Sequence, residues 1–352
     1  MLTQWLDGRR MVICAGSGGV GKTTTAAAVA LGLAEQGKKV AVVTIDPARR
    51  LADALGLQEL DNEPRRVEAD VAGELWAMML DAKRTFDELI EALAPDERTR
   101  DEVFANRIYQ QLSSAVAGSQ EFTAIAKLYE LDRSGEFDVL VLDTPPSRNA
   151  LDFLDAPGRL TRFFQGRAIR VFLRPAGLSG RIIGRGGSVV FSILQRVTGV
   201  DLLRDLSVFF RSLGGMIDGF TERARRVGAL LSDPATTFLI VTAPRHDPVE
   251  EAIYFHRKLR EADMPFGGLV VNRVHQPPDD ALPDAVASGL GPALAERVTL
   301  ATSELAALAA RDAANVARLR DALADPPTIL VPELDDDVHD LDGLAQIREH
   351  LF

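Results

Sequence analysis

The amino-acid sequence predicts an α/β fold in which a mostly parallel β-sheet is covered by helices on both faces. Short, nearly continuous apolar runs rich in β-branched residues recur along the chain, and helical stretches separate them. This pattern is typical of parallel strands that are buried on both faces. In addition, the first apolar run, 11–15, leads through a glycine-rich segment into an Ala-rich helical stretch, 23–38.

The predicted elements follow from these patterns in chain order. The expected strands are 11–15, 39–45, 75–80 (the weakest), 137–142, 237–242, 267–271 and 328–331. Two long stretches, about 82–132 and 148–234, contain no convincing strand and predict a helical subdomain inserted into a single domain that spans 1–352. The last helix, 340–352, carries acidic residues among its apolar ones, so we expect it to dock onto the sheet.

One apolar stripe in the second helical stretch has helical spacing. A core-facing helix explains it more simply than a ligand groove does. The stripe consists of Leu202, Leu206, Phe209, Leu213, Ile217 and Phe220.

Composition excludes several classes of protein. The 352 residues are 46% hydrophobic, enough for a sizeable core, and the net charge of −11 disfavours nonspecific nucleic-acid binding. The sequence shows no signal peptide and no run of about 18 or more apolar residues, so we expect a cytoplasmic protein. Its only cysteine, Cys14, excludes an internal disulfide and a CxxC metal site, and is expected to be a small core residue.

The glycine-rich segment matches the phosphate-binding P-loop pattern G-x-x-x-x-G-K-[ST] in full. It reads GSGGVGKT and consists of Gly16, Ser17, Gly18, Gly19, Val20, Gly21, Lys22 and Thr23. Backbone N–H groups and the helix dipole converge on an anion at such a strand-to-helix junction. Lys22 can reach the β- and γ-phosphates, and the Thr23 hydroxyl can hold Mg²⁺. A chance glycine-rich turn would not have both flanks correct.

Two aspartates follow predicted strands. Asp143 comes directly after 137–142, where P-loop enzymes place a second group on the Mg²⁺ side; a helix cap is the alternative, but the following Thr-Pro-Pro-Ser favours a loop. Asp46 comes after 39–45, and Pro47 ends that strand. At this edge of the sheet Asp46 could orient or deprotonate an attacking water, or it could simply form an Asx-turn.

The expected base is adenine. No Asn-Lys-x-Asp motif for guanine occurs in the chain, and the corresponding strand ends in Val271-Asn272-Arg273. The Asn272 amide can donate to and accept from an adenine edge; its alternative role is that of a turn residue.

Taken together, these motifs resemble the arsenite-pump ATPase (ArsA-like) family, which includes ATPases that target tail-anchored membrane proteins. The resemblance rests on GSGGVGKTT, TIDPARRLADALG and LDTPPSRNAL. It is extended by Ala117-Gly118-x-x-Glu121, Val271-Asn272 and VPELDDDVHD, and runs in order from about 11 to 345. The chain looks most similar to the single-domain, actinobacterial-type members.

The resemblance implies an ATP- and Mg²⁺-dependent dimer with nucleotides at the subunit interface. Lys22, Thr23 and Thr24 would hold phosphate and Mg²⁺, Asp46 would activate water, and Asn272 and Pro332 would frame the adenine. Switch residues would report the γ-phosphate to the helical subdomain. They are Pro47, Thr144, Pro145, Pro146, Ser147, Arg148, Asn149 and Glu121.

Four departures qualify the resemblance. The family's P-loop usually carries a lysine that reaches the partner's phosphates, and here Ser17 stands in its place. Because cations completing such a site can be worth ~10³–10⁵ in rate, we expect slow hydrolysis as a homodimer unless Arg49 or Arg148 substitutes. The alternative is a heterodimer with a lysine-bearing paralogue.

The other departures concern cysteines and one acidic position. No CxxC pair is present, so no zinc is expected, and one cysteine with one P-loop disfavours arsenite export. The position of a common acidic residue after 237–242 is Arg245.

A basic stretch stands out in this acidic chain. Residues 156–200 contain eight arginines and no Asp or Glu, with apolar residues between them. Three interpretations remain open: a solvated helical lobe, a groove for an apolar client, and a peripheral contact with anionic lipid.

The leading functional hypothesis is therefore an ATP-driven switch that binds an apolar protein segment. Alternatives from other classes are a ParA/MinD-type positioning ATPase, the ATPase subunit of an anion pump, and a small-molecule kinase.

Overall fold

The computed structural model describes residues 2–46, 48–107, 109–110, 120–145, 208–278 and 291–352. The chain separates into two compact units. Unit 1 consists of Met1–Met79, Leu131–Leu151 and Leu231–Phe352, and unit 2 of Leu80–Glu130 and Asp152–Leu230. The basic stretch 156–200 lies outside the described residues.

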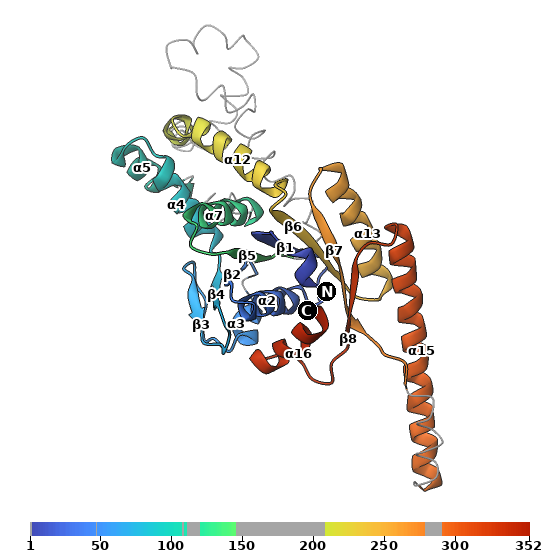
Figure 1. Ribbon diagram of the computed structural model, residues 1–352. Helices are drawn as coiled ribbons and strands as arrows, with labels where there is room; N and C mark the ends of the chain where they lie inside the picture. The colour runs from blue at the N-terminus through green and yellow to red at the C-terminus, as the bar shows by residue number, and fades with distance from the viewer. Residues whose placement is uncertain (1, 47, 108, 111–119, 146–207, 279–290) are drawn as a thin grey trace, which may run out of the picture. The chain divides into compact units, whose positions relative to one another are not determined.

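Unit 1 is built on an eight-stranded sheet with the order β3-β4-β2-β5-β1-β6-β7-β8 (Figure 1). The strands are β1 (Met11–Ala15), β2 (Lys39–Thr44), β3 (Arg65–Val67), β4 (Glu74–Met79), β5 (Val139–Asp143), β6 (Thr236–Thr242), β7 (Phe266–Val274) and β8 (Thr328–Pro332). Every neighbouring pair is parallel except β3 with β4. The predicted α/β fold with a mostly parallel sheet is therefore confirmed.

One face of the sheet is covered by α1 (Leu2–Trp5), α2 (Lys22–Glu35), α3 (Arg50–Ala54) and α16 (Leu341–Leu351). Alternate strand residues such as Val12, Val40 and Val241 are fully buried against these helices. The last helix packs on α2 and β8, and the Phe352 ring occupies the space beside Gly32, where a Cβ would meet it at 2.3 Å. Predicted docking onto the sheet thus takes place largely through α2.

The opposite face carries α13 (His246–Glu261), whose Phe255 ring meets Phe238 of β6 edge-on. Next to α13 lies α15 (Pro292–Ala322), a 31-residue helix that also contacts β7. Helices therefore cover both faces, as the nearly all-buried strands require. Among the described residues, no helix is long and apolar enough to cross a membrane.

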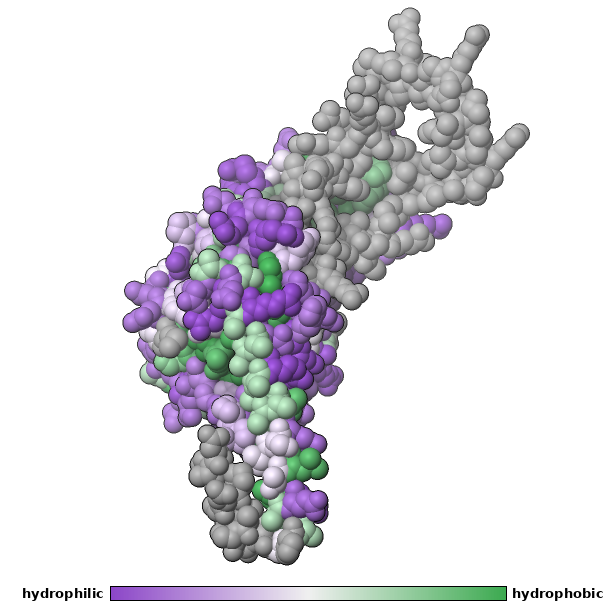
Figure 2. All heavy atoms as spheres, turned by 90° about the vertical axis from the view of Figure 1, so that its right-hand side faces the viewer, coloured by the Kyte–Doolittle hydropathy of each residue, from purple (hydrophilic) through white to green (hydrophobic). Residues whose placement is uncertain are grey.

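Several elements of unit 1 were not predicted, namely the helices α1, α3 and α13, the edge strand β3 and the long helix α15. Strand β3 is only three residues long and pairs antiparallel at the sheet's edge. Helix α15 is rich in alanine and, from Ala293 to Leu308, has no buried side chain, so it lacks the clear apolar face on which a prediction depends. Figure 2 shows apolar side chains among the polar ones on the surface of this part of the molecule. Leu294, Leu300 and Leu305 of α15 are exposed.

Unit 2 is helical where it is described. It contains α4 (Ala82–Leu93), α5 (Glu97–Phe104), most of α7 (Gln120–Ser134) and most of α12 (Ile217–Leu231). Its core is aromatic: Phe86 stacks on both Tyr109 and Phe220, and Phe209 packs against Tyr109.

The apolar stripe predicted in this region faces this core in part. Phe209, Leu213 and Phe220 are buried, and Ile217 is half-buried. The structure contradicts a single continuous helix, because a turn at Gly215 and Met216 separates two helical segments. Leu202 and Leu206 lie outside the described residues.

Candidate functional site

The P-loop joins the end of β1 to the start of α2, which begins at Lys22, one residue earlier than predicted. Its glycines are required for two reasons: Gly16 lies too close to another strand for a side chain, and Gly19 and Gly21 have positive φ. A Cβ on Gly16 would lie 1.9 Å from the Val241 carbonyl oxygen, and Gly19 and Gly21 have φ of +74° and +87°. Gly18 and Gly19 are exposed, whereas Ser17 and Val20 are buried. The loop therefore turns its backbone, rather than side chains, toward the space above α2.

Lys22 lies folded against this loop. Its ammonium donates a hydrogen bond to the Ser17 carbonyl oxygen at 2.9 Å, and the residue is buried. Burial lowers the pKa of Lys22, and the nearby carboxylates of Asp143 and Asp46 act against that shift. The ammonium is thus close to two carboxylates and poised at the mouth of the loop.

Asp143 is the last residue of β5 rather than the first residue after it, and it lies in register with Cys14 and Thr44 on the neighbouring strands. Its Oδ2 accepts hydrogen bonds from the hydroxyls of Thr23 (2.6 Å) and Thr44 (2.9 Å). Its partners are therefore side-chain hydroxyls, not the backbone N–H groups that a helix cap would accept.

The other carboxylate oxygen of Asp143, Oδ1, is buried and has no hydrogen-bond partner among the described residues. Burial raises the pKa of Asp143 to about 6, against the smaller opposing effects of the two hydroxyls and Lys22. A buried, under-coordinated carboxylate beside a threonine hydroxyl is an oxygen donor set of the kind that Mg²⁺ prefers. The residues present therefore fit a Mg²⁺ ion.

Asp46 forms the Asx-turn that was considered for it, and its second carboxylate oxygen lies near Arg50. Its Oδ1 accepts the Ala48 N–H at 3.0 Å, which is an Asx-turn, and its Oδ2 lies 3.7 Å from the Arg50 guanidinium. The half-buried carboxylate also lines the cavity described below. Pro47 lies outside the described residues.

The predicted second switch begins at the end of β5. The Thr144 hydroxyl donates to the Cys14 carbonyl oxygen at 2.8 Å, which ties this segment to β1. Pro145 is half-buried. Pro146, Ser147, Arg148 and Asn149 lie outside the described residues. Glu121 belongs to α7, but its side chain lies outside them too.

Asn272 lies inside β7, so the alternative of a turn residue is wrong. Its side-chain amide donates to the Val20 carbonyl oxygen at 3.0 Å. A Cβ on Gly21 would lie 2.2 Å from the same amide nitrogen. Asn272 therefore packs against the P-loop from β7. Pro332 is the last residue of β8 rather than part of a loop.

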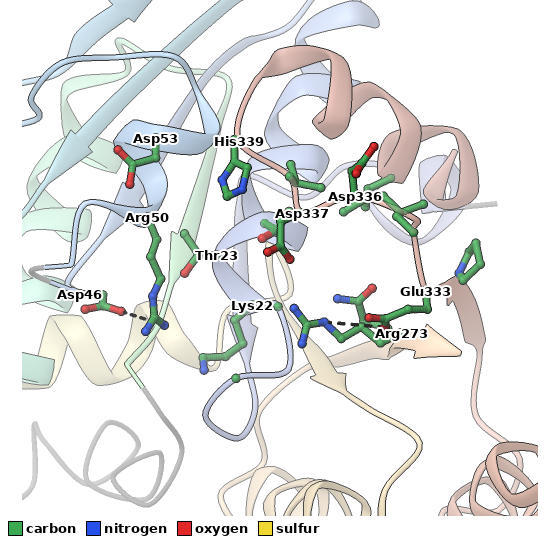
Figure 3. Close-up of a pocket in the computed structure, with 18 of the residues that line it drawn as sticks. Lys22, Thr23, Asp46, Arg50, Asp53, Arg273, Glu333, Asp336, Asp337 and His339 are labelled. Atoms are coloured by element: carbon green, nitrogen blue, oxygen red, sulfur yellow. Dashed lines mark ion pairs between the residues drawn. The ribbon is translucent and has the colours of Figure 1, made fainter. Parts of the chain in front are cut away.

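These segments enclose a cavity of about 450 Å³ (Figure 3), a volume typical of small-molecule sites. The predicted residues that line it are Gly19, Gly21, Lys22, Thr23, Thr24, Asp46, Thr144, Asn272 and Pro332. In Figure 3, Asp46 and Arg50 lie on one side, Arg273 and Glu333 on the other, and Lys22 between them. Cys14, fully buried behind Asp143, does not line it.

Several lining residues were not predicted. They are Arg50, Asp53, Arg273, Glu333, Leu334, Asp336, Asp337, Val338, His339 and Ile347. The acidic ending VPELDDDVHD signalled part of this set, since it follows the edge strand β8. Arg50 and Asp53 lie on the short helix α3 after β2, within the segment TIDPARRLADALG on which the family resemblance rests, but no site role was predicted for them.

The family model described as "Anion-transporting ATPase" matches residues 9–285, more than half of the chain. The chain belongs to the ArsA ATPase family. The family predicted from the P-loop, the Asp-Pro loop and the loop after β5 is thereby confirmed.

Three relatives show how similar this ArsA-family chain is to other proteins. It is 28% identical to the "ATPase ASNA1 homolog" of Cryptosporidium parvum over 77% of this chain and 66% of that protein. It is 27% identical to "ATPase GET3" of Rhodotorula glutinis over 78% and 73% of the two chains. It is also 27% identical to "Putative arsenical pump-driving ATPase 1" of Aquifex aeolicus over 69% and 58%. The match thus spans about two thirds of the length of these relatives.

Proposed function

We propose that this ArsA-family chain is an ATP-hydrolysing, dimeric switch that couples its nucleotide state to the binding of an apolar protein segment. The observation that carries the ATPase part is the buried Asp143 carboxylate. One of its oxygens has no partner among the described residues, and the Thr23 hydroxyl and Lys22 lie beside it in a complete P-loop. The client part rests on the family resemblance, which includes ATPases that target tail-anchored membrane proteins, and on similarity to proteins named GET3 and ASNA1.

The proposed roles follow from position. The P-loop N–H groups and Lys22 bind the phosphates, and Thr23 and Asp143 hold Mg²⁺. When bound, Mg²⁺ would neutralise charge on the phosphate oxygens. Asp46 orients the attacking water through Oδ2, which is paired only loosely with the exposed Arg50 at 3.7 Å. Asn272 and Pro332 frame the base, for which we propose adenine.

Phosphate release from Mg-ATP by the purified chain tests the ATPase proposal, together with nucleotide binding by calorimetry. We expect Lys22→Ala to abolish both. Lys83→Ala is the matched control, because Lys83 is exposed in unit 2 and paired with Asp87; it should change neither. Wild-type protein that binds no nucleotide would contradict the proposal.

The dimer is proposed to contain either two copies of this chain or one copy and a lysine-bearing paralogue. Ser17 is buried and its hydroxyl has no partner among the described residues, so this chain offers no cation there. We expect Ser17→Lys to raise the turnover of the homodimer. Unchanged turnover in a variant that still forms dimers would remove the basis for a heterodimer.

Client binding can be tested with a soluble carrier protein that ends in about 20 apolar residues, the length of a membrane span. We expect it to co-elute with the chain in one nucleotide state only. A carrier with a polar tail of equal length is the control. Equal retention of both tails would contradict a client role.

A second candidate is the ATPase subunit of an anion pump, because the family model carries the description "Anion-transporting ATPase". The only cysteine, Cys14, is fully buried, and burial raises the pKa of its thiol, so it is a poor ligand for a metalloid. Stimulation of phosphate release by arsenite or another oxyanion would favour this candidate over client binding.

A further inference from the structure

Strand β7 contains an irregularity at the edge of the cavity. Val271 pairs with Leu330, and Val274 pairs with Pro332, so three residue steps of β7 oppose two of β8. The extra residue falls at Asn272 and Arg273, and Arg273 has φ of +62°. This is a β-bulge with a non-glycine residue in the left-handed region, a conformation that such residues rarely adopt.

The bulge changes where side chains point. In a regular strand, successive side chains point to opposite faces of the sheet. Here Asn272 and Arg273 both line the cavity. Asn272 is buried and its amide is engaged by the Val20 carbonyl oxygen, whereas the Arg273 side chain is 46% exposed. The bulge therefore delivers a second polar group, Arg273, to the side of the cavity away from Asp46 (Figure 3).

The chain on both sides of Arg273 is held firmly. Asp312 of α15 is fully buried and accepts hydrogen bonds from the His275 backbone N–H (3.1 Å) and from its ring Nδ1 (2.7 Å). The Glu333 N–H donates to the Val274 carbonyl oxygen at 3.1 Å. The Glu333 carboxylate also lies 4.0 Å from the Arg273 guanidinium. The surrounding structure thus maintains the bulge and restrains the Arg273 side chain.

We infer that Arg273 is a base-contacting residue whose guanidinium stacks on the purine ring of the bound nucleotide. The inference rests on the proposed nucleotide site and adds to it the residue that selects the class of base. A guanidinium is planar, delocalised and weakly hydrated, so it can stack on an aromatic face. Arg273 adjoins Asn272 and lies with Pro332 among the lining residues, on the other side of the cavity from Arg50, with Lys22 between the two arginines.

Stacking has a distinctive consequence for specificity. It depends on ring area and not on the exocyclic groups that distinguish adenine from guanine. Arg273 therefore contributes to preference for purine over pyrimidine nucleotides and leaves the ratio of ATP to GTP affinity unchanged.

The test is competition of ATP, GTP and UTP, each with Mg²⁺, against a fluorescent ATP analogue. Arg273→Ala should weaken ATP and GTP by about 3- to 30-fold, the range of a cation–π contact, and UTP by less. Arg273→Gly should bind as weakly while tolerating the positive φ, which separates loss of the side chain from loss of the bulge. Arg318→Ala is the matched control: this arginine of α15 is similarly exposed and pairs with Glu250.

Each outcome decides the inference. Selective weakening of both purine nucleotides supports it. Equal weakening of all three nucleotides places Arg273 on the phosphate or ribose and overturns it, as does unchanged binding in both variants. If wild-type protein binds no nucleotide at all, the proposed function fails first and the inference fails with it.

Discussion

Two buried aspartates of unit 1 differ in how their charge is satisfied. Asp143 ends β5 beside Thr23 of the P-loop, and Asp312 of α15 lies beside His275, which follows the bulged strand β7. Both are at most 1% exposed. Asp312 receives hydrogen bonds from His275 and Arg311 at both of its oxygens, whereas Asp143 receives two hydroxyl hydrogen bonds at one oxygen only. Burial of the same chemical group therefore has two different outcomes.

Their pKa values move in opposite directions for this reason. Burial raises the pKa of Asp143 to about 6. Burial also acts to raise the pKa of Asp312, but the hydrogen bonds from His275 and Arg311 outweigh it and hold the pKa below its ordinary value. A buried carboxylate whose oxygens all accept hydrogen bonds stabilises the fold. A buried carboxylate with an oxygen that has no hydrogen-bond partner can instead bind a cation. The comparison predicts a structural role for Asp312 and a functional role for Asp143.

Between the two aspartates, the larger effect on activity is expected from Asp143→Asn. The amide keeps the size and can keep one hydroxyl contact, but it removes the charge that would hold Mg²⁺. We expect phosphate release to fall by about 10²–10³, as when one group that stabilises transition-state charge is lost, while the fold remains intact. The rate should be compared at saturating Mg-ATP with thermal unfolding of the same sample. Normal turnover would show that Asp143 is not functional.

Asp312→Ala should instead damage the fold. It removes a buried carboxylate that accepts hydrogen bonds from His275 and from the half-exposed Arg311, so we expect a loss of about 2–3 kcal/mol in the free energy of unfolding. Urea unfolding followed by tryptophan fluorescence reports on unit 1, because Trp5 and Trp76 both lie there. The control is Glu250→Ala, which breaks an exposed pair with Arg318 and should cost at most about 1 kcal/mol. Similar losses in both variants would contradict the distinction.

The pH dependence of stability without Mg²⁺ sharpens the comparison further. Because the native pKa of Asp143, about 6, exceeds its ordinary value of 3.8, the native state holds a proton that the unfolded chain has released between these pH values. Its contribution therefore falls as the pH rises from about 4 to 6, by at most about 3 kcal/mol. Asp312 has the opposite sign: its contribution is present above about 4 and is lost as the pH falls further. Asp143→Asn should flatten the first slope, and an unchanged slope would contradict the assignment.

The same contrast explains what the sequence could predict. The edge of the sheet beside the P-loop is regular, because strands β2 and β5 end in register. Asp143, Thr44 and Asp46 could therefore be placed at this edge from their positions at the ends of apolar runs. On the other side of the cavity, the positions of Asn272 and Arg273 depend on a β-bulge. This bulge leaves no local sequence signature, because neither residue is glycine. Asp312, which accepts hydrogen bonds from His275 beside the bulge, belongs to α15. This helix was not predicted because its amphipathicity is weak. The partner of a bulge is fixed by tertiary packing, which local patterns do not encode.

The smallest loss of stability is expected from a change at Asn272, which connects the bulged strand β7 to the P-loop. Its amide donates to the Val20 carbonyl oxygen of the P-loop from the bulged strand. Asn272→Ala removes that hydrogen bond and should cost about 1 kcal/mol of stability. It should also weaken the binding of inorganic triphosphate, which has no base, because the P-loop loses a support. ATP should weaken by more, since the free amide oxygen would face the base, and the difference between the two ligands measures that contact. Unchanged triphosphate binding would show that Asn272 does not support the P-loop, and the two sides of the cavity would then act independently.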